Sequence, residues 1–303
     1  MPTQLVYNLY KHSIRSAYNS LGITQDISDS GLSFVEYEQI DNLEPHQVIE
    51  YITHSIKLRL QKVGTDILDE FLDSPRYRRI FFNNTELIIP LLNKQAVEWY
   101  GNSGLINFDC AVESFIGMHA NARTIYDIGG HQGVWAAYYS LVVGETGRVY
   151  TFEPSIINFE CSSLLFLINN MANVVNIPFG IGTQTLITKK QGTGLLVDFV
   201  EQNIGLLRFD QVFFERADFI KIDIEGYEYE FIKSFSNIFE FCPNIHLELH
   251  IPHLEKRGLD YRDIYTLIPF DKVNVLLYQH LKLRPVGKTD LLDGFCSLLI
   301  TRK

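Results

Sequence analysis

The spacing of hydrophobic positions along the chain changes near residue 122. In the first part, the segment "PHQVIEYITHSIKLRLQKVGTDILDEFL" carries apolar residues at three- and four-residue steps, for example Val48, Ile52, Ile56 and Val63. This spacing places the apolar side chains on one face of an amphipathic α-helix. The segment "FDCAVESFIGMHA" repeats the pattern on a smaller scale. We therefore expect the chain to be mainly helical up to about residue 120.

From residue 122 onward, short apolar runs alternate with helical segments. The predicted strands are 124–129, 147–153, 173–180, 218–224, 244–250, 273–279 and 294–301, and the predicted helices are 132–143, 156–171, 227–241 and 260–268. Such an alternation predicts an α/β domain whose mostly parallel sheet has helices on both faces. The last two predicted strands have no strong helix between them, so we expect an antiparallel pair at one edge of the sheet.

Composition and charge exclude several classes of function. The 303 residues fit one or two domains, and 26 basic against 36 acidic residues give a net charge of −10. Binding to a phosphate backbone needs clustered Lys and Arg, so we expect no nucleic-acid partner. No apolar run approaches the roughly 20 residues of a membrane span. The four cysteines are far apart, which is typical of reduced thiols and predicts a cytoplasmic protein.

The stretch "TIYDIGGHQG" places glycines directly after the first predicted strand of the sheet. Open parallel sheets bind ligands at the carboxyl ends of their strands, and glycine lets a ligand approach the main chain. The spacing differs from the dinucleotide fingerprint G-x-G-x-x-G, because His131 and Val134 stand where the second and third glycines belong. The carboxylate of Asp127 would also repel a pyrophosphate. It suits S-adenosylmethionine, which carries an ammonium group, a sulfonium and ribose hydroxyls.

A second acid, Glu153 in "VYTFEP", ends the next predicted strand. An acid at this position accepts hydrogen bonds from ribose hydroxyls. Either feature alone also fits a tight turn followed by a solvated strand-end charge. Together, Asp127 and Glu153 at neighbouring strand ends predict a nucleoside site.

The segment "IKIDIEGYE" carries three charged residues at alternate positions. Lys221, Asp223 and Glu225 should share one side of the strand, because successive side chains point to opposite faces. If the nucleoside is S-adenosylmethionine, the reaction is methyl transfer, which requires an aligned acceptor and, for a hydroxyl, removal of a proton. We expect Asp223 or Glu225 to orient the acceptor or to act as the base; the alternative is an ion-paired strand terminus.

A second polar cluster lies in "NIHLELHIPH", where His246, Glu248 and His250 share one face. Histidine can act as a base near neutral pH. His250, near the carboxyl end of the strand, is a candidate catalytic residue, whereas His246 is expected to be a hydrogen-bonded core residue and His253 to lie in a loop. Carboxylates with one imidazole suit Mg²⁺ or Mn²⁺. Because tight ligand spacing is missing, we do not expect a required divalent metal and assign no metal ligand.

Several of these segments together resemble one family. "TIYDIGGHQG", "VYTFEPS", "ADFIKIDIEGYEYEFIKSF" and "CPNIHLELH" occur in the order and spacing of FkbM-type methyltransferases, and "AVEWYGN" upstream is also similar. The resemblance covers roughly residues 95–250. It implies a seven-stranded class I methyltransferase fold, which is Rossmann-like, with S-adenosylmethionine as the methyl donor. It also implies O-methylation of a sugar or other natural-product hydroxyl. Many members have Ala-Asn where this chain has Gly130 and His131.

The sequence therefore predicts two parts, a helical N-terminal extension over 1–95 and a methyltransferase domain over 96–303. The extension is expected to cap the acceptor site or to form a homodimer interface. The loop after the third strand is expected to recognise adenine. The residues expected to bind the cofactor are Asp127, Gly129, Gly130, His131, Gly133, Glu153, Phe179 and Gly180, and those expected to be catalytic are Asp223, Glu225 and His250.

The acceptor is expected to be a small molecule or a glycan, and two other classes of function remain as alternatives. The first is an NAD-dependent oxidoreductase, against which the altered glycine spacing and Asp127 both argue. The second is a non-catalytic module that only binds a nucleoside. The "KIDIEG" segment argues against the second alternative. Trp99 and Tyr100 receive a weak role as site aromatics, because they lie just upstream of the core in "AVEWYGN".

Overall fold

The computed structural model describes residues 76–82, 85–91, 96–101, 121–177, 179–183, 186–190, 202–209, 216–280 and 282–303. The helices predicted before residue 76 and between 102 and 120 lie outside the described residues. No helix in the described part is both long enough and apolar enough to cross a membrane.

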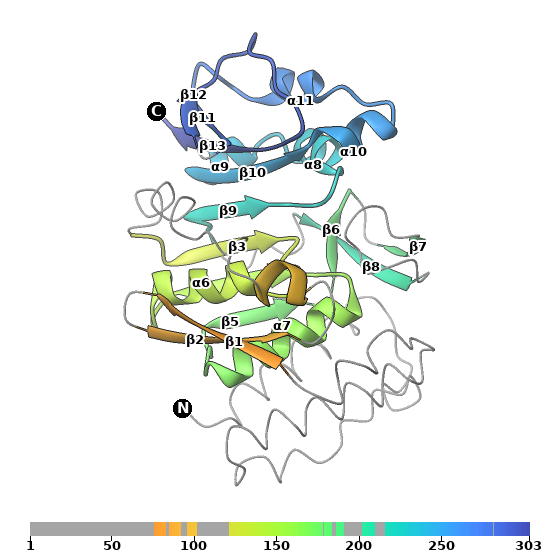
Figure 1. Ribbon diagram of the computed structural model, residues 1–303. Coiled ribbons are helices and arrows are strands. Elements are labelled where there is room, and N and C mark those ends of the chain that lie inside the picture. The colour runs from red at the N-terminus through yellow and green to blue at the C-terminus, as the bar shows by residue number, and fades with distance from the viewer. Residues whose placement is uncertain are drawn as a thin grey trace, which may run out of the picture.

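The main sheet has eight strands in the order β12-β11-β13-β10-β9-β3-β4-β5 (Figure 1). Their bounds are Thr124–Ile128 for β3, Arg148–Phe152 for β4, Val174–Ile177 for β5, Phe219–Ile222 for β9, Asn244–His250 for β10, Val273–Gln279 for β11, Lys282–Pro285 for β12 and Phe295–Arg302 for β13. The strands from β5 to β10 pair in parallel, whereas β13 is antiparallel to both of its neighbours. This arrangement confirms the predicted Rossmann-like α/β fold.

The edge of the sheet differs from the prediction in one respect. The last two predicted strands do pair antiparallel, as β11 and β13, but β13 lies inside the sheet, between β10 and β11. The outermost strand is β12, which was not predicted. All four of its side chains are exposed, so its sequence "KLRP" has no apolar alternation from which a strand could be recognised.

Helices cover both faces of the sheet. Their bounds are Val134–Val143 for α6, Ile156–Ile168 for α7, Glu228–Ser234 for α8, Ile238–Phe241 for α9, Ile251–Lys256 for α10 and Tyr261–Leu267 for α11. The segment predicted as one helix over 227–241 is thus two, α8 and α9. The helix α10, which begins directly after β10, was not predicted.

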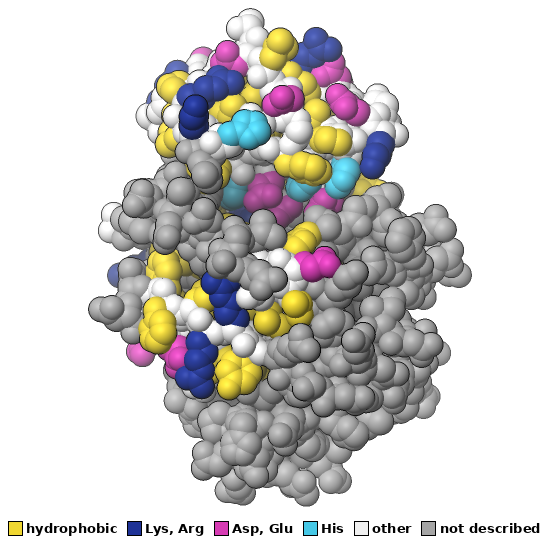
Figure 2. Space-filling model, in the orientation of Figure 1, with side chains coloured by type: hydrophobic (Ala, Val, Ile, Leu, Met, Phe, Trp, Pro, Cys, Tyr) yellow, Lys and Arg dark blue, Asp and Glu magenta, His cyan; other side chains and the backbone are white. Residues whose placement is uncertain are grey.

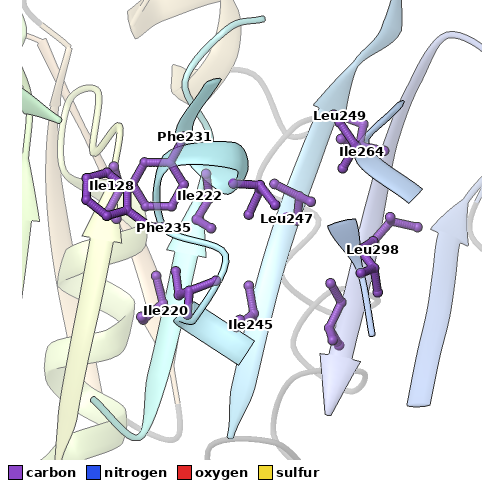
Figure 3. Close-up of a cluster of buried hydrophobic side chains, with 14 of the residues drawn as sticks. Ile128, Ile220, Ile222, Phe231, Phe235, Ile245, Leu247, Leu249, Ile264 and Leu298 are labelled. Carbon is purple, nitrogen blue, oxygen red and sulfur yellow. The ribbon is translucent and has the colours of Figure 1, made fainter. Parts of the chain in front are cut away.

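Alternate residues of the central strands build two separate cores. Ile220 and Ile222 of β9 pack with Leu247 of β10 and with α8 and α11 on one face (Figure 3). Ile125 and Phe219 pack with α6 on the other face. Because side chains alternate along a strand, the polar positions Asp127 and Lys221 fall on the α6 face. Near the strand ends this face turns from apolar to charged.

A β-hairpin precedes the sheet in the chain. Strand β1 spans Arg76–Phe82 and pairs antiparallel with β2, Thr85–Leu91. The prediction of a helical extension over 1–95 is therefore wrong for this stretch. Leu87, Ile89 and Leu91 are buried at alternate positions, the period of a strand rather than of a helix. The Asn169 side chain, just after α7, donates to the Ile88 carbonyl and accepts from its N–H, both at 2.8 Å.

Two further elements lie near the carboxyl ends of the strands. A single π-helical turn, η3 (Val97–Gly101), follows the hairpin. A small sheet of β6 (Gly180–Gly182), β8 (Gln202–Arg208) and β7 (Leu186–Lys190) lies at the end to which the arrows of β3 and β9 point (Figure 1). Strand order reverses between β3 and β9, and open α/β sheets bind ligands at such a switch point.

Candidate functional site

The loop after β3 folds back onto the neighbouring strands. The N–H groups of Gly129 and Gly130 both donate to the Phe152 carbonyl, at 3.0 and 2.9 Å. Gly129 has φ of 87°, and a Cβ atom there would lie 1.7 Å from the main-chain oxygen of Asp223. A side chain is therefore excluded by both backbone conformation and space. The glycine brings the β3 loop against the end of β9.

Gly133 serves a different contact from the one expected. It precedes α6 with φ of 80°, and a Cβ there would lie 2.6 Å from Ser162 Cβ and 2.7 Å from the Phe166 ring, both on α7. Gly133 thus permits two helices to approach each other, whereas the sequence predicted that it binds the cofactor. It is not among the residues that line the cavity described below.

Glu153 follows β4 and is held by the main chain. Its Oε2 accepts from the N–H of His131 at 2.8 Å, and its Oε1 accepts from the N–H of Ser155 at 2.7 Å. The side chain is buried. Burial raises the pKa of Glu153 to about 7, although the two N–H donors favour the ionised form and oppose this shift. Each carboxylate oxygen can accept a further hydrogen bond.

Two aromatic side chains of η3 reach the same loop. The Tyr100 hydroxyl lies 2.8 Å from Nδ1 of His131, and the Trp99 ring lies 5.0 Å from the His131 ring. Arg78 of the hairpin donates to the Tyr100 carbonyl at 3.1 Å. Burial lowers the pKa of His131 to about 4, so its ring is neutral near pH 7. The segment upstream of the core therefore forms one wall of the site.

Asp127 lies beneath the loop, in a buried ionic chain. Its Oδ2 accepts from the Thr151 hydroxyl at 3.1 Å, and its Oδ1 is 4.0 Å from Nζ of Lys221. Lys221 is fully buried and donates to Oδ2 of Asp223 at 2.7 Å. Burial raises the pKa of Asp127. Burial also acts to raise the pKa of Asp223, but the charges of Lys221 and His250 and the hydrogen bond from Lys221 together hold it below its usual value. Asp127 thus positions Lys221, and Lys221 positions Asp223.

Glu225 and His250 complete the group around Asp223. Nε2 of His250 lies 3.5 Å from Oδ1 of Asp223 and 3.5 Å from Oε2 of Glu225. Glu225 has φ of 54°, in the left-handed region that side chains rarely adopt, and such strain is common at functional sites. Burial raises the pKa of Glu225 to about 7. The three candidate catalytic residues therefore lie together.

Two further residues contact His250, and neither contact was predicted from the sequence. Glu228, at the start of α8, is fully buried, and its Oε1 lies 2.9 Å from Nδ1 of His250. His253 belongs to α10 rather than to a loop, and its ring stacks on that of His250 with centroids 5.5 Å apart. Apart from its place in "EGYE", nothing in the sequence indicates that Glu228 contacts His250. Pro252, in the first turn of α10, is a residue typical of helix starts, a signal that was not used in the prediction from the sequence.

Two cavities open at this end of the sheet. The first, of about 460 Å³, is lined among others by Trp99, Gly129, Glu153, Asp223 and Glu225. Figure 2 shows acidic and histidine side chains gathered in a recess of the visible face. We use the name cofactor cavity for this first space. Tyr100, Gly130 and His131 also line it, whereas Asp127 does not.

The second cavity, of about 400 Å³, is lined by His250, Tyr278 and Phe295 among others. We call it the side cavity. Glu248 lines both cavities, so the two spaces adjoin at this side chain. Burial raises the pKa of Glu248 to about 7. Asp223 and Glu225 line the cofactor cavity and His250 lines the side cavity, so the candidate catalytic residues are divided between the two linings.

The residues expected to recognise adenine lie elsewhere. Phe179 is buried in the core cluster that includes Phe152 and Ile177, and it does not line the cofactor cavity. Gly180 begins β6, where a Cβ atom would lie 2.8 Å from the Leu206 side chain. The structure therefore brings together the residues of the β3 loop, Glu153 and the acids after β9, but leaves these two residues outside the lining.

Comparison with known proteins shows which family the chain matches. The family model described as the methyltransferase FkbM domain matches residues 127–279, just over half of the chain. This match includes the β3 loop and the acids after β9. No curated protein matches the chain.

Several solved structures are similar to the chain at low identity. Methyltransferase FkbM from Methylobacillus flagellatus KT is 21% identical with a TM-score of 0.41; the match covers 59% of this chain and 43% of that one. An O-methyltransferase from Bacillus cereus in complex with SAH is 15% identical with a TM-score of 0.42, covering 69% and 86%. A putative rRNA methylase from Clostridium thermocellum is 13% identical with a TM-score of 0.44, covering 64% and 96%. The present chain thus spans less than half the length of the first protein.

Proposed function

The chain belongs to the FkbM methyltransferase domain family, and from this premise we propose that it is an S-adenosylmethionine-dependent O-methyltransferase. Its acceptor is a hydroxyl of a sugar, a glycan or another small natural product. The single observation that carries the proposal is the cofactor cavity, in which the β3 glycine loop and Glu153 face Asp223 and Glu225. One wall offers ribose acceptors, and the opposite wall offers carboxylates for proton removal.

Within the cofactor cavity, each wall has a separate task. The carboxylate of Glu153 accepts hydrogen bonds from the ribose hydroxyls, since both its oxygens are already fixed by main-chain donors. Trp99 and the neutral His131 ring offer flat surfaces for stacking. The nucleoside therefore lies between η3 and the end of β4, with its sulfonium toward Asp223.

The reaction is an in-line displacement at the methyl carbon. The acceptor oxygen forms a bond to that carbon while the carbon–sulfur bond breaks, and the sulfur keeps the electron pair of the broken bond. The hydroxyl proton passes to a carboxylate at the site, for which Glu225 and Asp223 are the candidates because both line the cofactor cavity. Much of the acceleration over the reaction in solution comes from holding the acceptor oxygen and the methyl group next to each other in the cavity.

The side cavity is the proposed entry for the acceptor. It adjoins the cofactor cavity at Glu248 and ends at His250. Phe295 is largely exposed there, and Tyr278 lines the same space. Aromatic faces beside polar groups suit a sugar ring, whose C–H face is apolar and whose hydroxyls need hydrogen-bond partners.

Calorimetric titration with S-adenosylmethionine tests the cofactor, and transfer of a labelled methyl group to a panel of sugars and phenols tests the reaction. We expect Asp223→Asn and Glu225→Gln to reduce turnover at least about tenfold while S-adenosylmethionine affinity changes little. Absence of cofactor binding by the wild-type chain would refute the proposal. Full activity of both variants would remove the two acids from the mechanism.

A further inference from the structure

Asp223, Glu225 and His250 each direct one potential ligand atom toward a common point. The three atoms lie within 4.8 Å of one another, and Nε2 of His250 is 3.5 Å from an oxygen of each carboxylate. These separations are too long for hydrogen bonds. They fit donor atoms around a cation about 2.1 Å from each after small side-chain adjustments. The spacing along the chain did not reveal the group, because β10 supplies the histidine and the β9 end supplies both acids.

Glu228 fixes the orientation of the histidine. Its Oε1 accepts from the N–H of Gly226 at 2.9 Å and lies 2.9 Å from Nδ1 of His250. A carboxylate oxygen can only accept, so Nδ1 carries the proton and donates it to Glu228. Burial lowers the pKa of His250, but Glu228, Asp223 and Glu225 together raise it to about 9, so a cation would have to displace the Nε2 proton before Nε2 presents a lone pair to Asp223 and Glu225. A carboxylate that orients a histidine in this way is the usual outer partner of a metal-binding imidazole.

The charges around this point also favour a cation. Lys221 supplies one positive charge, which Asp127 and Asp223 share. Among the described residues, the ion-pair partners of Glu225, Glu228 and Glu248 are histidines only. The acids around this point thus outnumber its one permanent positive charge, although Lys221 also acts on Glu225 and Glu248 from a greater distance. Burial of carboxylates without compensating charge is costly, and a bound cation would supply that charge.

We propose that Asp223, Glu225 and His250 bind a divalent cation of the Mg²⁺ and Mn²⁺ class. Two carboxylates and one imidazole suit these ions, which prefer six ligands, so three coordination positions stay open for water or acceptor. The site lies where the cofactor cavity meets the side cavity, since the acids line the first and His250 lines the second. If the proposed methyl transfer is correct, the cation holds two adjacent oxygens of the acceptor and lowers the pKa of the bound hydroxyl, whose proton leaves to water; Asp223 and Glu225 then act by holding the cation rather than by taking the proton. A vicinal diol of a sugar is the class that fits.

The test is Mn²⁺ binding to the full chain after dialysis against a chelator, with free Mn²⁺ measured by its electron paramagnetic resonance signal. We expect one Mn²⁺ per chain, with affinity reduced at least about tenfold in Glu225→Gln. The matched control is Glu240→Gln, which removes the same charge from an exposed surface pair with Lys272 and should bind Mn²⁺ like the wild type. Circular dichroism of each variant establishes that it is folded.

Two outcomes overturn the cation site. One is a wild-type chain that binds no Mn²⁺ at millimolar concentration, in which case His250 is an imidazolium between the two acids. The other is equal Mn²⁺ affinity in Glu225→Gln and Glu240→Gln. Calorimetry with S-adenosylmethionine on the chelator-treated chain separates this inference from the proposed function. Cofactor binding without Mn²⁺ binding refutes the cation site alone, and Mn²⁺ binding without cofactor binding refutes the methyltransferase proposal alone.

Discussion

At the scale of single residues, Glu153 combines burial with a polar task. Its carboxylate is shielded from water yet receives two main-chain N–H groups. The balance leaves the pKa at about 7, far above the usual value for glutamate. The residue that is proposed to hold the ribose is therefore poised to change charge near neutral pH.

S-adenosylmethionine affinity should depend on pH through this residue. Above pH 7 Glu153 is ionised and accepts from the ribose hydroxyls; below pH 7 it gains a proton and part of that capacity is lost. We expect the affinity at pH 6 to be about tenfold weaker than at pH 8, because one pH unit below the pKa leaves about a tenth of the group ionised. Titration calorimetry across this range measures the slope. In Glu153→Gln the slope should decrease markedly, although Glu225 and Glu248, which line the same cavity and also have pKa values of about 7, still titrate in this range; an unchanged slope would assign it to those two groups.

The indole of Trp99 permits a second prediction at this scale. Trp99→Ala should weaken S-adenosylmethionine binding about tenfold, because loss of an aromatic contact costs about 0.5–1.5 kcal/mol beyond its buried area. Trp99→Phe keeps a ring beside His131 and should retain most of the affinity. Fluorescence titration of the alanine variant would use Trp135 as the remaining indole. Equal affinities in both variants would exclude stacking on this side chain.

At the scale of elements, the β3 loop decides whether the site can assemble. Gly129 and Gly130 donate to the end of β4, and Gly129 also touches the main chain at the end of β9. The turn after β3 therefore contacts the ends of β4 and β9 through main-chain atoms, with no side chain of Gly129 or Gly130 in between. The same turn places His131 beside Glu153.

A comparison of two glycines isolates this contact. Gly129 and Gly144 both have positive φ, but a Cβ at Gly144 meets nothing within 4 Å, whereas at Gly129 it meets the Asp223 carbonyl. Gly144 has ψ of −175°, so it lies in a region essentially confined to glycine, and Gly144→Ala should lower the free energy of unfolding by about 1–3 kcal/mol from backbone strain alone. Gly129→Ala should cost about 3 kcal/mol or more, because main-chain atoms have to move. Urea unfolding measures both, and equal losses would refute the steric argument.

At the scale of the whole molecule, the N-terminal hairpin is joined to the methyltransferase core. Leu87 and Ile89 are buried in the same cluster as Val134 and Phe166, and Asn169 binds the main chain of Ile88. Through Arg78 the hairpin also holds η3, whose aromatics line the cofactor cavity. A boundary at residue 95 would therefore cut through a shared core.

A truncated chain that begins at residue 96 should be less stable than the full chain. Each fully buried leucine or isoleucine contributes about 1.5–3 kcal/mol, so loss of β2 alone should lower the melting temperature markedly. We also expect weaker S-adenosylmethionine binding, because Tyr100 loses its contact with Arg78. Thermal unfolding and calorimetry measure these effects, and light scattering reports whether a dimer is lost. A truncated chain with unchanged stability, affinity and oligomeric state would show that residues 1–95 serve neither as cap nor as interface.

The sequence by itself determined the central strands and the residues at their ends. Periodicity predicted β10 and β11 at their observed bounds, because buried strands must be apolar on at least one face. The glycines after β3, Glu153 after β4 and the acids after β9 were all recognisable from their places behind apolar runs. These signals are local, since each depends on only a few neighbouring residues.

The tertiary structure alone decided which polar residues meet. Glu228 and His253 reach His250 from α8 and α10, and Asp127 reaches Lys221 from β3, although the spacing along the chain carries no sign of these contacts. Contacts of this kind depend on strand order and helix packing, which bring distant segments together. The hairpin β1–β2 was missed although its inward residues alternate; among the described residues it packs against η3, α6 and α7, and these contacts depend on the tertiary structure.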